Sequence, residues 1–443
     1  MSTDARRRPP ATGAGTRRSR TRLKIFAVLW IIVLLNFVDR ASLSISMPFI
    51  SEEFDLSPAL QGWILGSFFW TYLLFQIPGG WLLDRIGPRR VVGASGALWG
   101  LFQLAGGLVG SGGALLGTRL GLGAAEAPVF PAASKLNSRW LPSSERARGA
   151  TFIDAAGPFG SAVGGLLITG LIGLTGGWRA AFVITGALTV LVAVLYYLYL
   201  RDTPQEHPRV DEAELAHITA GQDVADTTTE DVALPGVGDY ARSRSWWGLW
   251  LGRLGWATVW WGIISWTPSY LSDSLGFDLA AIGWGTFVVY GSGVVGQLVA
   301  GWATDRFRAG TTHYNRVMRT ILAVSGVGTA VSVLSLAAVD SGYVALVVLS
   351  VAVFFNQFGG VYWAFPSWLA PKAQVGTVGS VMNVASSAGG GIAPVVMGYS
   401  IALSGGYAGS FVFLAVAAAV YLAGSLSIDF ERPLARRRAE PVA

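Results

Sequence analysis

The chain has 443 residues, of which 52% are hydrophobic and 13% are charged, and its mean hydropathy is +0.50. Soluble domains carry about 25% charged residues, so charge is too sparse here to cover a soluble surface, and apolar side chains must face lipid. The sequence contains no cysteine, which excludes a disulfide framework, thiol catalysis and a cysteine-ligated zinc site.

Apolar stretches long enough to span a membrane, at roughly 20 residues each, recur about twelve times along the chain. Because backbone groups in lipid must be hydrogen-bonded internally, we predict helices rather than open strands. The boundary between the third and fourth stretches, at residues 111–113, is weakly marked. The predicted spans are residues 23–47, 61–83, 91–111, 113–135, 149–173, 178–200, 246–271, 280–303, 318–339, 342–365, 375–402 and 407–428.

Basic residues gather in every second connection between the predicted spans. They lie in residues 6–24, 85–90, 135–148, 306–319 and 436–438. The alternate connections hold acids such as Glu52, Asp273 and Asp340, and essentially no lysine or arginine. This asymmetry follows the positive-inside rule and predicts that both termini are cytoplasmic. It also accounts for the net charge of +6 without a nucleic-acid partner.

A long polar segment divides the predicted spans into two sets of six. The run Gly80–Arg85 (GWLLDR) returns as Gly301–Arg306 (GWATDR), so the two sets are predicted to be related bundles. Membrane proteins built from such repeats commonly place a binding site between them, near the bilayer midplane. We expect a central cavity lined by predicted helices one, four, five, seven, ten and eleven. The predicted domains are a disordered basic cytoplasmic tail over residues 1–22, bundles over 23–200 and 246–428, a cytoplasmic linker over 201–245 and a cytoplasmic tail over 429–443.

Four ionisable residues lie well inside the predicted spans: Asp39 and Arg40 in the first, and Arg119 and Glu126 in the fourth. Charge is costly at that depth, so each is a functional candidate. Arg119 and Glu126 are about two helical turns apart and share a face. The alternative for each pair is a structural role in joining helices. Arg253 lies near a predicted helix end, where it is expected to snorkel toward the interface.

The sequence contains several motifs that are too specific to arise from composition alone. They are Asn36–Arg40 (NFVDR), Gln76–Trp81 (QIPGGW), Gly80–Arg90 (GWLLDRIGPRR), Arg119–Pro131 and Gly376–Asn383 (GTVGSVMN). Together they resemble the anion:cation symporter family of the major facilitator superfamily, over about residues 23–428. Bacterial members of that family carry sugar acids such as galactonate and glucarate, or tartrate or phthalate.

The resemblance implies an all-α membrane protein with twelve transmembrane helices in two six-helix bundles, in a plasma or inner membrane. It implies proton-carrying roles for Asp39 and Glu126, and roles in substrate binding and coupling for Arg40 and Arg119. It also implies a cytoplasmic gate. The gate candidates are Gly80, Asp84, Arg85, Arg89, Arg90, Asp305 and Arg306.

Other polar side chains within the spans are candidates for hydrogen bonds to a polyol, with a helix–helix contact as the alternative for each. They are Tyr72, Gln297, Asn356, Gln357 and Asn383. Asp154 stands where the family pattern has asparagine. As a third acid it either alters proton coupling or rejects multiply charged substrates; the alternative is that it lies in water near the cytoplasmic end. The seven tryptophans of the seventh span are expected mainly at the interface or in packing, with one or two at the cavity.

Enzyme signatures are missing from the sequence. It has no P-loop pattern, and its three histidines fall in predicted loops without metal-ligand spacing. We therefore expect no enzyme activity, cofactor or metal, and a monomeric secondary transporter that couples a small organic anion, such as a sugar acid, to protons by symport. The alternative is an anion exchanger or a proton-driven efflux transporter for an aromatic or other carboxylate. The intramembrane charges disfavour a non-transporting receptor.

Overall fold

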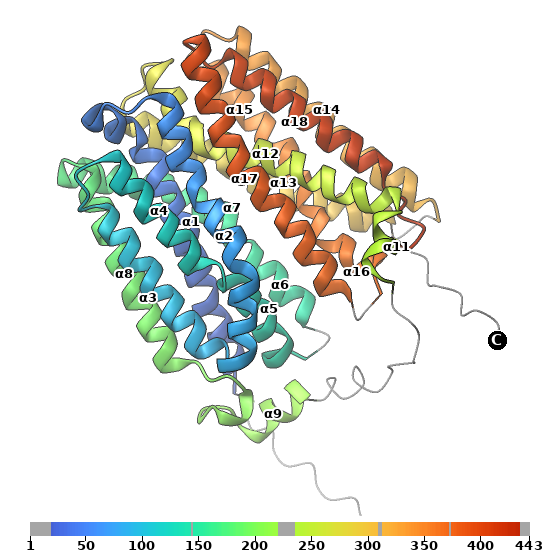
Figure 1. Cartoon of the computed structure of the whole chain (residues 1–443). Helices are drawn as coiled ribbons and strands as arrows, with labels where there is room; N and C mark the ends of the chain where they lie inside the picture. The colour runs from blue at the N-terminus through green and yellow to red at the C-terminus, as the bar shows by residue number, and fades with distance from the viewer. Residues whose placement is uncertain (1–18, 143–144, 220–234, 309–311, 372–373, 435–443) are drawn as a thin grey trace, which may run out of the picture.

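The structure, a computed structural model, describes residues 19–142, 145–219, 235–308, 312–371 and 374–434. Within these ranges every regular element is helical, and the helices form two adjacent groups (Figure 1). Parts of the predicted tails and linker, residues 1–18, 220–234 and 435–443, lie outside the described residues, and the predicted domain boundaries stay predictions. The prediction of an all-α membrane fold with two six-helix bundles is confirmed.

The N-terminal bundle contains six spanning units. They are α1 (Thr21–Phe54), α2 (Pro58–Ile86), α3 (Pro88–Gly106), α4 (Gly112–Glu126) with α5 (Val129–Trp140), α6 (Arg146–Asp154) with α7 (Ala156–Thr175), and α8 (Trp178–Tyr199). The weakly marked boundary after α3 is a real break, because Ser111 caps α4 by accepting a hydrogen bond from the Ala114 N–H at 3.2 Å.

The C-terminal bundle also contains six spanning units, and short helices precede it. The short helices are η1 (Pro204–Glu206), α9 (Glu212–Thr219) and α11 (Val237–Ala241). The spanning units are α12 (Arg244–Asp273), α13 (Leu279–Arg308), α14 (Tyr314–Ser335) with η2 (Leu336–Ala338), α15 (Gly342–Asn356) with η3 (Gln357–Ala364) and α16 (Phe365–Leu369), α17 (Val375–Ser404), and α18 (Ala408–Ser427). Eight helical segments in the described part of the chain are long and apolar enough to cross a membrane by length and composition.

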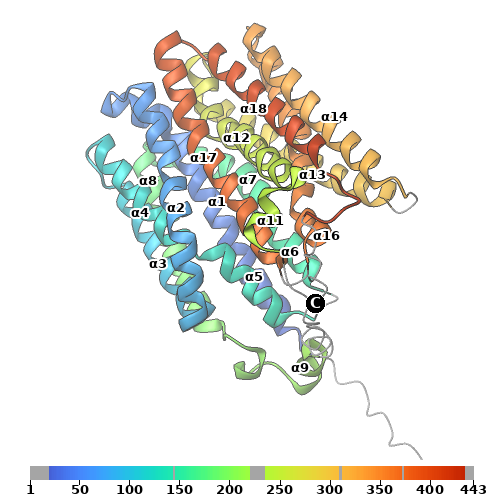
Figure 2. The same cartoon turned by 45° about the vertical axis from the view of Figure 1, so that its right-hand side comes forward.

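The two bundles meet through close helix crossings on the side of the α1–α2 connection. There α2 lies beside α17 in both views (Figures 1 and 2). A Cβ at Gly62 of α2 would lie 2.5 Å from the Pro394 carbonyl oxygen of α17, so only glycine permits this approach. Nearer the opposite ends, Gly80 of α2 and Gly379 of α17 have no neighbouring atom within 4 Å of a Cβ position. The bundles therefore pack tightly on one side of the molecule.

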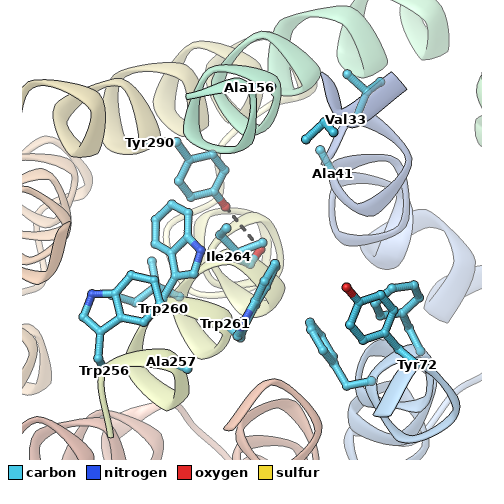
Figure 3. Close-up of a cluster of buried hydrophobic side chains, with 14 of the residues drawn as sticks. Val33, Ala41, Tyr72, Ala156, Trp256, Ala257, Trp260, Trp261, Ile264 and Tyr290 are labelled. Carbon is cyan, nitrogen blue, oxygen red and sulfur yellow. Dashed lines mark hydrogen bonds between the residues drawn. The ribbon is translucent and has the colours of Figure 1, made fainter. Parts of the chain in front are cut away.

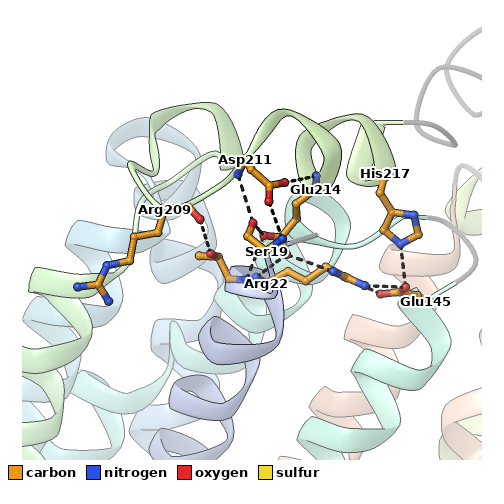
Figure 4. Close-up of polar contacts among 8 residues, drawn as sticks. Ser19, Arg22, Glu145, Arg209, Asp211, Glu214 and His217 are labelled. Atoms are coloured by element: carbon orange, nitrogen blue, oxygen red, sulfur yellow. Dashed lines mark hydrogen bonds and ion pairs between the residues drawn. The ribbon is translucent and has the colours of Figure 1, made fainter. Parts of the chain in front are cut away.

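On the opposite side, the short helix α9 is fastened to the start of α1 (Figure 4). Glu214 of α9 accepts hydrogen bonds from the backbone N–H groups of Thr21 and Arg22, at 3.0 and 3.1 Å. Arg22 extends further to Glu145, at 3.0 Å, and His217 also contacts Glu145, at 2.9 Å. Arg22 is the main reason that the pKa of Glu145 is lowered to about 2. The first span, the α5–α6 connection and α9 are thus joined by one charged network.

Candidate functional site

A cavity lies between the two bundles. Its lining comes from all six predicted spans, one, four, five, seven, ten and eleven, and also from the second and eighth, α2 and α13. Three charged residues line it: Arg40, Asp154 and Arg253. The cavity is therefore shared between the bundles and contains two cations and one carboxylate.

Arg40 projects from the middle of α1 toward the cavity. Its Nη2 donates a hydrogen bond to Glu126, whose side chain is fully buried, while the Arg40 side chain stays 13% exposed. Its guanidinium also lies 4.3 Å from the ring centroid of Phe68 and 5.0 Å from that of Trp261, at cation–π distance. Arg40 thus stands between the cavity and Glu126, with aromatic rings around it.

Glu126 is the last residue of α4, and Pro128 separates α4 from α5. Proline lacks the backbone N–H that would continue the helical hydrogen-bond ladder. The break places Glu126 behind Arg40. Its second oxygen, Oε2, is buried without a hydrogen-bond partner, so Arg40 holds a carboxylate that is only half satisfied.

Asp39 and Arg119 face away from the cavity, into the N-terminal bundle. Asp39 accepts hydrogen bonds from the Trp99 indole at 2.8 Å and from the Thr189 hydroxyl at 3.2 Å. Arg119 donates to Gln103 at 2.7 Å. Consecutive helical residues point about 100° apart, so Asp39 and Arg40 lie on different faces of α1. The four predicted charges therefore form two arrangements, one at the cavity wall and one inside the bundle.

Arg253 contradicts its prediction. It does not snorkel, because it is 2% exposed and lines the cavity. Its guanidinium lies 4.0 Å from the ring centroid of Trp256 and 4.7 Å from that of Trp363. The cavity therefore has a charged residue from the C-terminal bundle, besides those of the N-terminal bundle. An arginine three residues before a tryptophan on one helix face was the signal available in the sequence.

Asp154 ends α6 at the cavity and joins the two bundles. Its Oδ2 accepts a hydrogen bond from Gln297 of α13 at 3.1 Å. Its place in the lining and its hydrogen bond to Gln297 put Asp154 at the wall of the cavity. Gln297 was predicted as a substrate ligand, and in this structure its amide is engaged by Asp154.

The uncharged candidates divide between cavity and bundle interior. Tyr72, Asn383 and Gln357 line the cavity. Asn356 is fully buried, outside the lining, with its Nδ2 3.5 Å from the Trp256 carbonyl oxygen. Asn356 and Gln357 are consecutive residues at the junction of α15 and η3. Consecutive helical side chains point about 100° apart, so one lies in the interior and the other at the cavity.

Aromatic side chains form much of the remaining wall. Trp256, Trp260 and Trp261 project from α12, and Tyr72 lies on α2 beyond them (Figure 3). Trp261 stacks on Phe37 with ring centroids 6.2 Å apart and planes at 12°, which is a contact between the bundles. More tryptophans of α12 reach the cavity than the one or two that were expected.

The gate candidates lie near the ends of α2 and α3 in the N-terminal bundle and of α13 in the C-terminal bundle. Asp84 pairs with Lys135 of α5 at 2.6 Å, and Arg85 lies over the Trp81 ring. The backbone N–H of Arg89 donates to Asp202 at 2.7 Å. Gly87, with φ of 84°, makes the turn that a side chain would strain. The remaining candidates Arg90, Asp305 and Arg306 are exposed. The contacts described here stay within one bundle.

The fold and the shared cavity define a membrane transporter with one central site between two helix bundles. The chain belongs to the Major Facilitator Superfamily, whose family profile matches residues 29–394. It is a multi-pass membrane protein.

Three curated relatives extend along nearly the whole chain. A probable sulfoacetate transporter from Cupriavidus necator is 29% identical and covers 94% of this chain and 95% of its own. A probable galactarate/D-glucarate transporter from Bacillus subtilis is 28% identical, with 91% and 90% covered. A D-galactonate transporter from Escherichia coli is 29% identical, with 94% and 96% covered. These relatives are named as transporters of organic acids, not as enzymes.

Among solved structures, the chain is similar to a bacterial homolog of the human lysosomal transporter Spinster in an inward-facing and occupied conformation. The TM-score is 0.77 at 20% sequence identity, with 94% of this chain and 99% of the other covered. This likeness shows the fold.

Proposed function

We propose that the protein is a proton-coupled symporter of a small organic anion, a sugar acid or a related carboxylate, working by alternating access. The observation that carries the proposal is the pair formed by Arg40 and Glu126 at the wall of a cavity between the bundles. The names of the relatives, which include galactonate, galactarate and sulfoacetate transporters, support an acidic substrate.

The coupling follows from competition for Arg40. A substrate carboxylate that reaches Arg40 competes with Glu126 for the guanidinium and weakens the hydrogen bond that Arg40 donates to Glu126. A carboxylate left alone in a dry site favours its neutral form and takes up a proton. Asp39, held by Trp99 and Thr189, is a second proton-carrying candidate. Arg119 supports this inner network, while Tyr72 and Asn383 offer hydrogen bonds to the substrate.

The positive-inside pattern orients the transporter with both termini, α9 and the gate residues in the cytoplasm. The tight α2–α17 contact then lies on the outer side, and the cavity faces inward. Because the sequence has no cysteine, single cysteines test this directly. A cysteine at Thr219 is expected to react with a membrane-impermeant label only from inside, and one at Ser341 only from outside. Labelling in the opposite sense would reverse the orientation.

The deciding experiment is transport into proteoliposomes with a pH gradient. We expect the wild type to accumulate a sugar acid, and Glu126→Gln to exchange it without accumulation. Glu53→Gln is the matched control, because Glu53 pairs with Arg179 at a partly exposed site far from the cavity chemistry. If Glu126→Gln accumulates substrate as the wild type does, Glu126 is not in the proton path.

A second candidate is exchange or efflux of an aromatic carboxylate. The tryptophans of the cavity wall, among them Trp256, Trp260 and Trp261, favour it because flat rings stack on aromatic substrates. Accumulation driven by a preloaded anion, with no response to a pH gradient, would distinguish this candidate from symport. A single chain encloses the whole cavity, which agrees with transport by a monomer.

A further inference from the structure

Arg253 carries a positive charge that the described structure does not neutralise at contact distance. The rings of Trp256 and Trp363 hold the guanidinium at 4.0 and 4.7 Å, and its Nε and Nη1 atoms are buried without hydrogen-bond partners. A buried cation in this condition is costly, and its charge favours an anion nearby. Arg253 also lines the cavity, so that anion can come from the cavity side.

Asp154 supplies a carboxylate to the lining of the same cavity, from the other bundle. It is the one acid in the described lining, and it attracts Arg253 electrostatically. The two do not form an ion pair among those of the described residues, so space remains between them. Gln297 of α13 fixes the position of Asp154 by a 3.1 Å hydrogen bond.

The charges of the site balance without substrate. Arg40 is matched by Glu126 within the N-terminal bundle, and Arg253 is matched across the cavity by Asp154. A substrate with one carboxylate adds one negative charge, which a single proton offsets. A second carboxylate on the same substrate would approach Arg253 beside the negative charge of Asp154, and like charges so close in a dry site repel.

We infer that Asp154 selects substrates by charge: it takes the place of a second substrate carboxylate beside Arg253, so the site binds singly charged acids in preference to doubly charged ones. This inference rests on the proposed function, since it assumes that the cavity holds an organic acid with one carboxylate at Arg40. It assigns Asp154 as a specificity-determining residue and Arg253 as the cation on which it acts.

The test compares binding of D-galactonate, a monoacid, with binding of galactarate, the corresponding diacid, to the purified full-length protein by isothermal titration calorimetry. Wild type is expected to bind galactonate more tightly. Asp154→Asn keeps the size of the side chain and an acceptor for Gln297 but removes the charge. It is expected to raise galactarate affinity relative to galactonate by about tenfold.

Two further variants separate charge from structure. Asp154→Glu keeps the negative charge and should keep the wild-type ratio of the two affinities. In an Arg253→Gln background, Asp154→Asn should leave the ratio unchanged, because the cation that would receive the second carboxylate is gone. Each variant must elute as a single monodisperse species before titration.

The outcomes are distinct. Equal ratios in wild type and Asp154→Asn overturn the charge selection but leave the proposed function standing. A shift that persists in the Arg253→Gln background overturns the assignment of Arg253. If neither acid binds to the wild type, the proposed sugar-acid function fails, and the charge selection fails with it.

Discussion

The two cavity arginines differ in where their acidic partners lie. Arg40 and Glu126 both belong to the N-terminal bundle and are in direct contact, whereas Arg253 belongs to the C-terminal bundle and its nearest cavity acid, Asp154, belongs to the other. In the proposed alternating-access cycle, a pair within one bundle would keep its geometry while the bundles rock against each other, and only a ligand or a proton would break it. A pair across the cavity changes with every rearrangement of the bundles. The first arrangement suits coupling, and the second suits discrimination between substrates.

The largest effect on substrate affinity is expected from removing Arg40, the cation of the pair that lies within the N-terminal bundle. Arg40→Ala leaves the buried Glu126 carboxylate without its partner, and it also removes the positive charge that α1 presents to the cavity. Truncating one member of such a pair costs about 2–5 kcal/mol, so substrate affinity should fall by at least about thirtyfold. Titration calorimetry with a sugar acid measures the loss. Arg179→Ala, at a partly exposed pair, is the control, and equal affinities in Arg40→Ala and the control would remove Arg40 from the site.

Asp39→Asn gives a sharper comparison with Arg40→Ala, because Asp39 is next to Arg40 in sequence but its side chain faces the interior of the N-terminal bundle. Asp39→Asn can still accept hydrogen bonds from Trp99 and Thr189, so substrate binding should stay within a factor of about three. Each coupled proton contributes about tenfold accumulation per pH unit, and that factor should disappear. Uptake into liposomes at a fixed pH gradient measures it. Undiminished accumulation would make Asp39 a structural residue.

The next prediction concerns the contact that brings the bundles together. Gly62→Ala places a Cβ 2.5 Å from the Pro394 carbonyl oxygen, which should separate α2 from α17. Because this contact closes the proposed outer side, the population should shift toward the conformation that is open to the outside. Spin labels on cysteines at Thr175 and Ser404, both exposed, should move apart in double electron–electron resonance. Gly170→Ala is the control, because no atom lies within 4 Å of its Cβ position. Identical distance distributions in the two variants would show that the crossing tolerates a side chain.

Much of the fold follows from the sequence because lipid imposes simple rules. Long apolar runs and alternating basic connections predicted the spans, and the high cost of intramembrane charge singled out Arg40 and Glu126. The direction in which each side chain points around its helix could not be predicted from the sequence. Asp39 turns inward while Arg40 faces the cavity, because packing against α3 and α8 sets the phase of α1.

Arg253 was missed for a different reason. An arginine among tryptophans resembles an interfacial belt in sequence, and only tertiary structure shows that Trp256 and Trp363 enclose it beside the cavity. Asn356 and Gln357 were equal candidates in sequence, and only the structure shows that Gln357 lines the cavity while Asn356 is buried outside the lining. Continuous spans can thus be predicted from one chain, whereas the site depends on contacts between helices that are distant in sequence.

The smallest effect is expected at the charged network that fastens α9 to α1. Glu145 contacts Arg22 and His217, and its side chain is 25% exposed, so Glu145→Gln should lower the free energy of unfolding by about 1 kcal/mol at neutral pH.

Arg22 holds the pKa of Glu145 at about 2, below its ordinary value of 4.5. A lowered pKa in the folded state stabilises above the ordinary value, and that stabilisation is lost as pH falls from about 4.5 toward about 2. The difference in melting temperature between wild type and Glu145→Gln should therefore be constant from pH 7 to pH 5 and shrink below. Glu206→Gln, at an exposed position in η1, should match the wild type throughout. A difference that persists undiminished at pH 3 would show that the carboxylate charge is not what fastens α9.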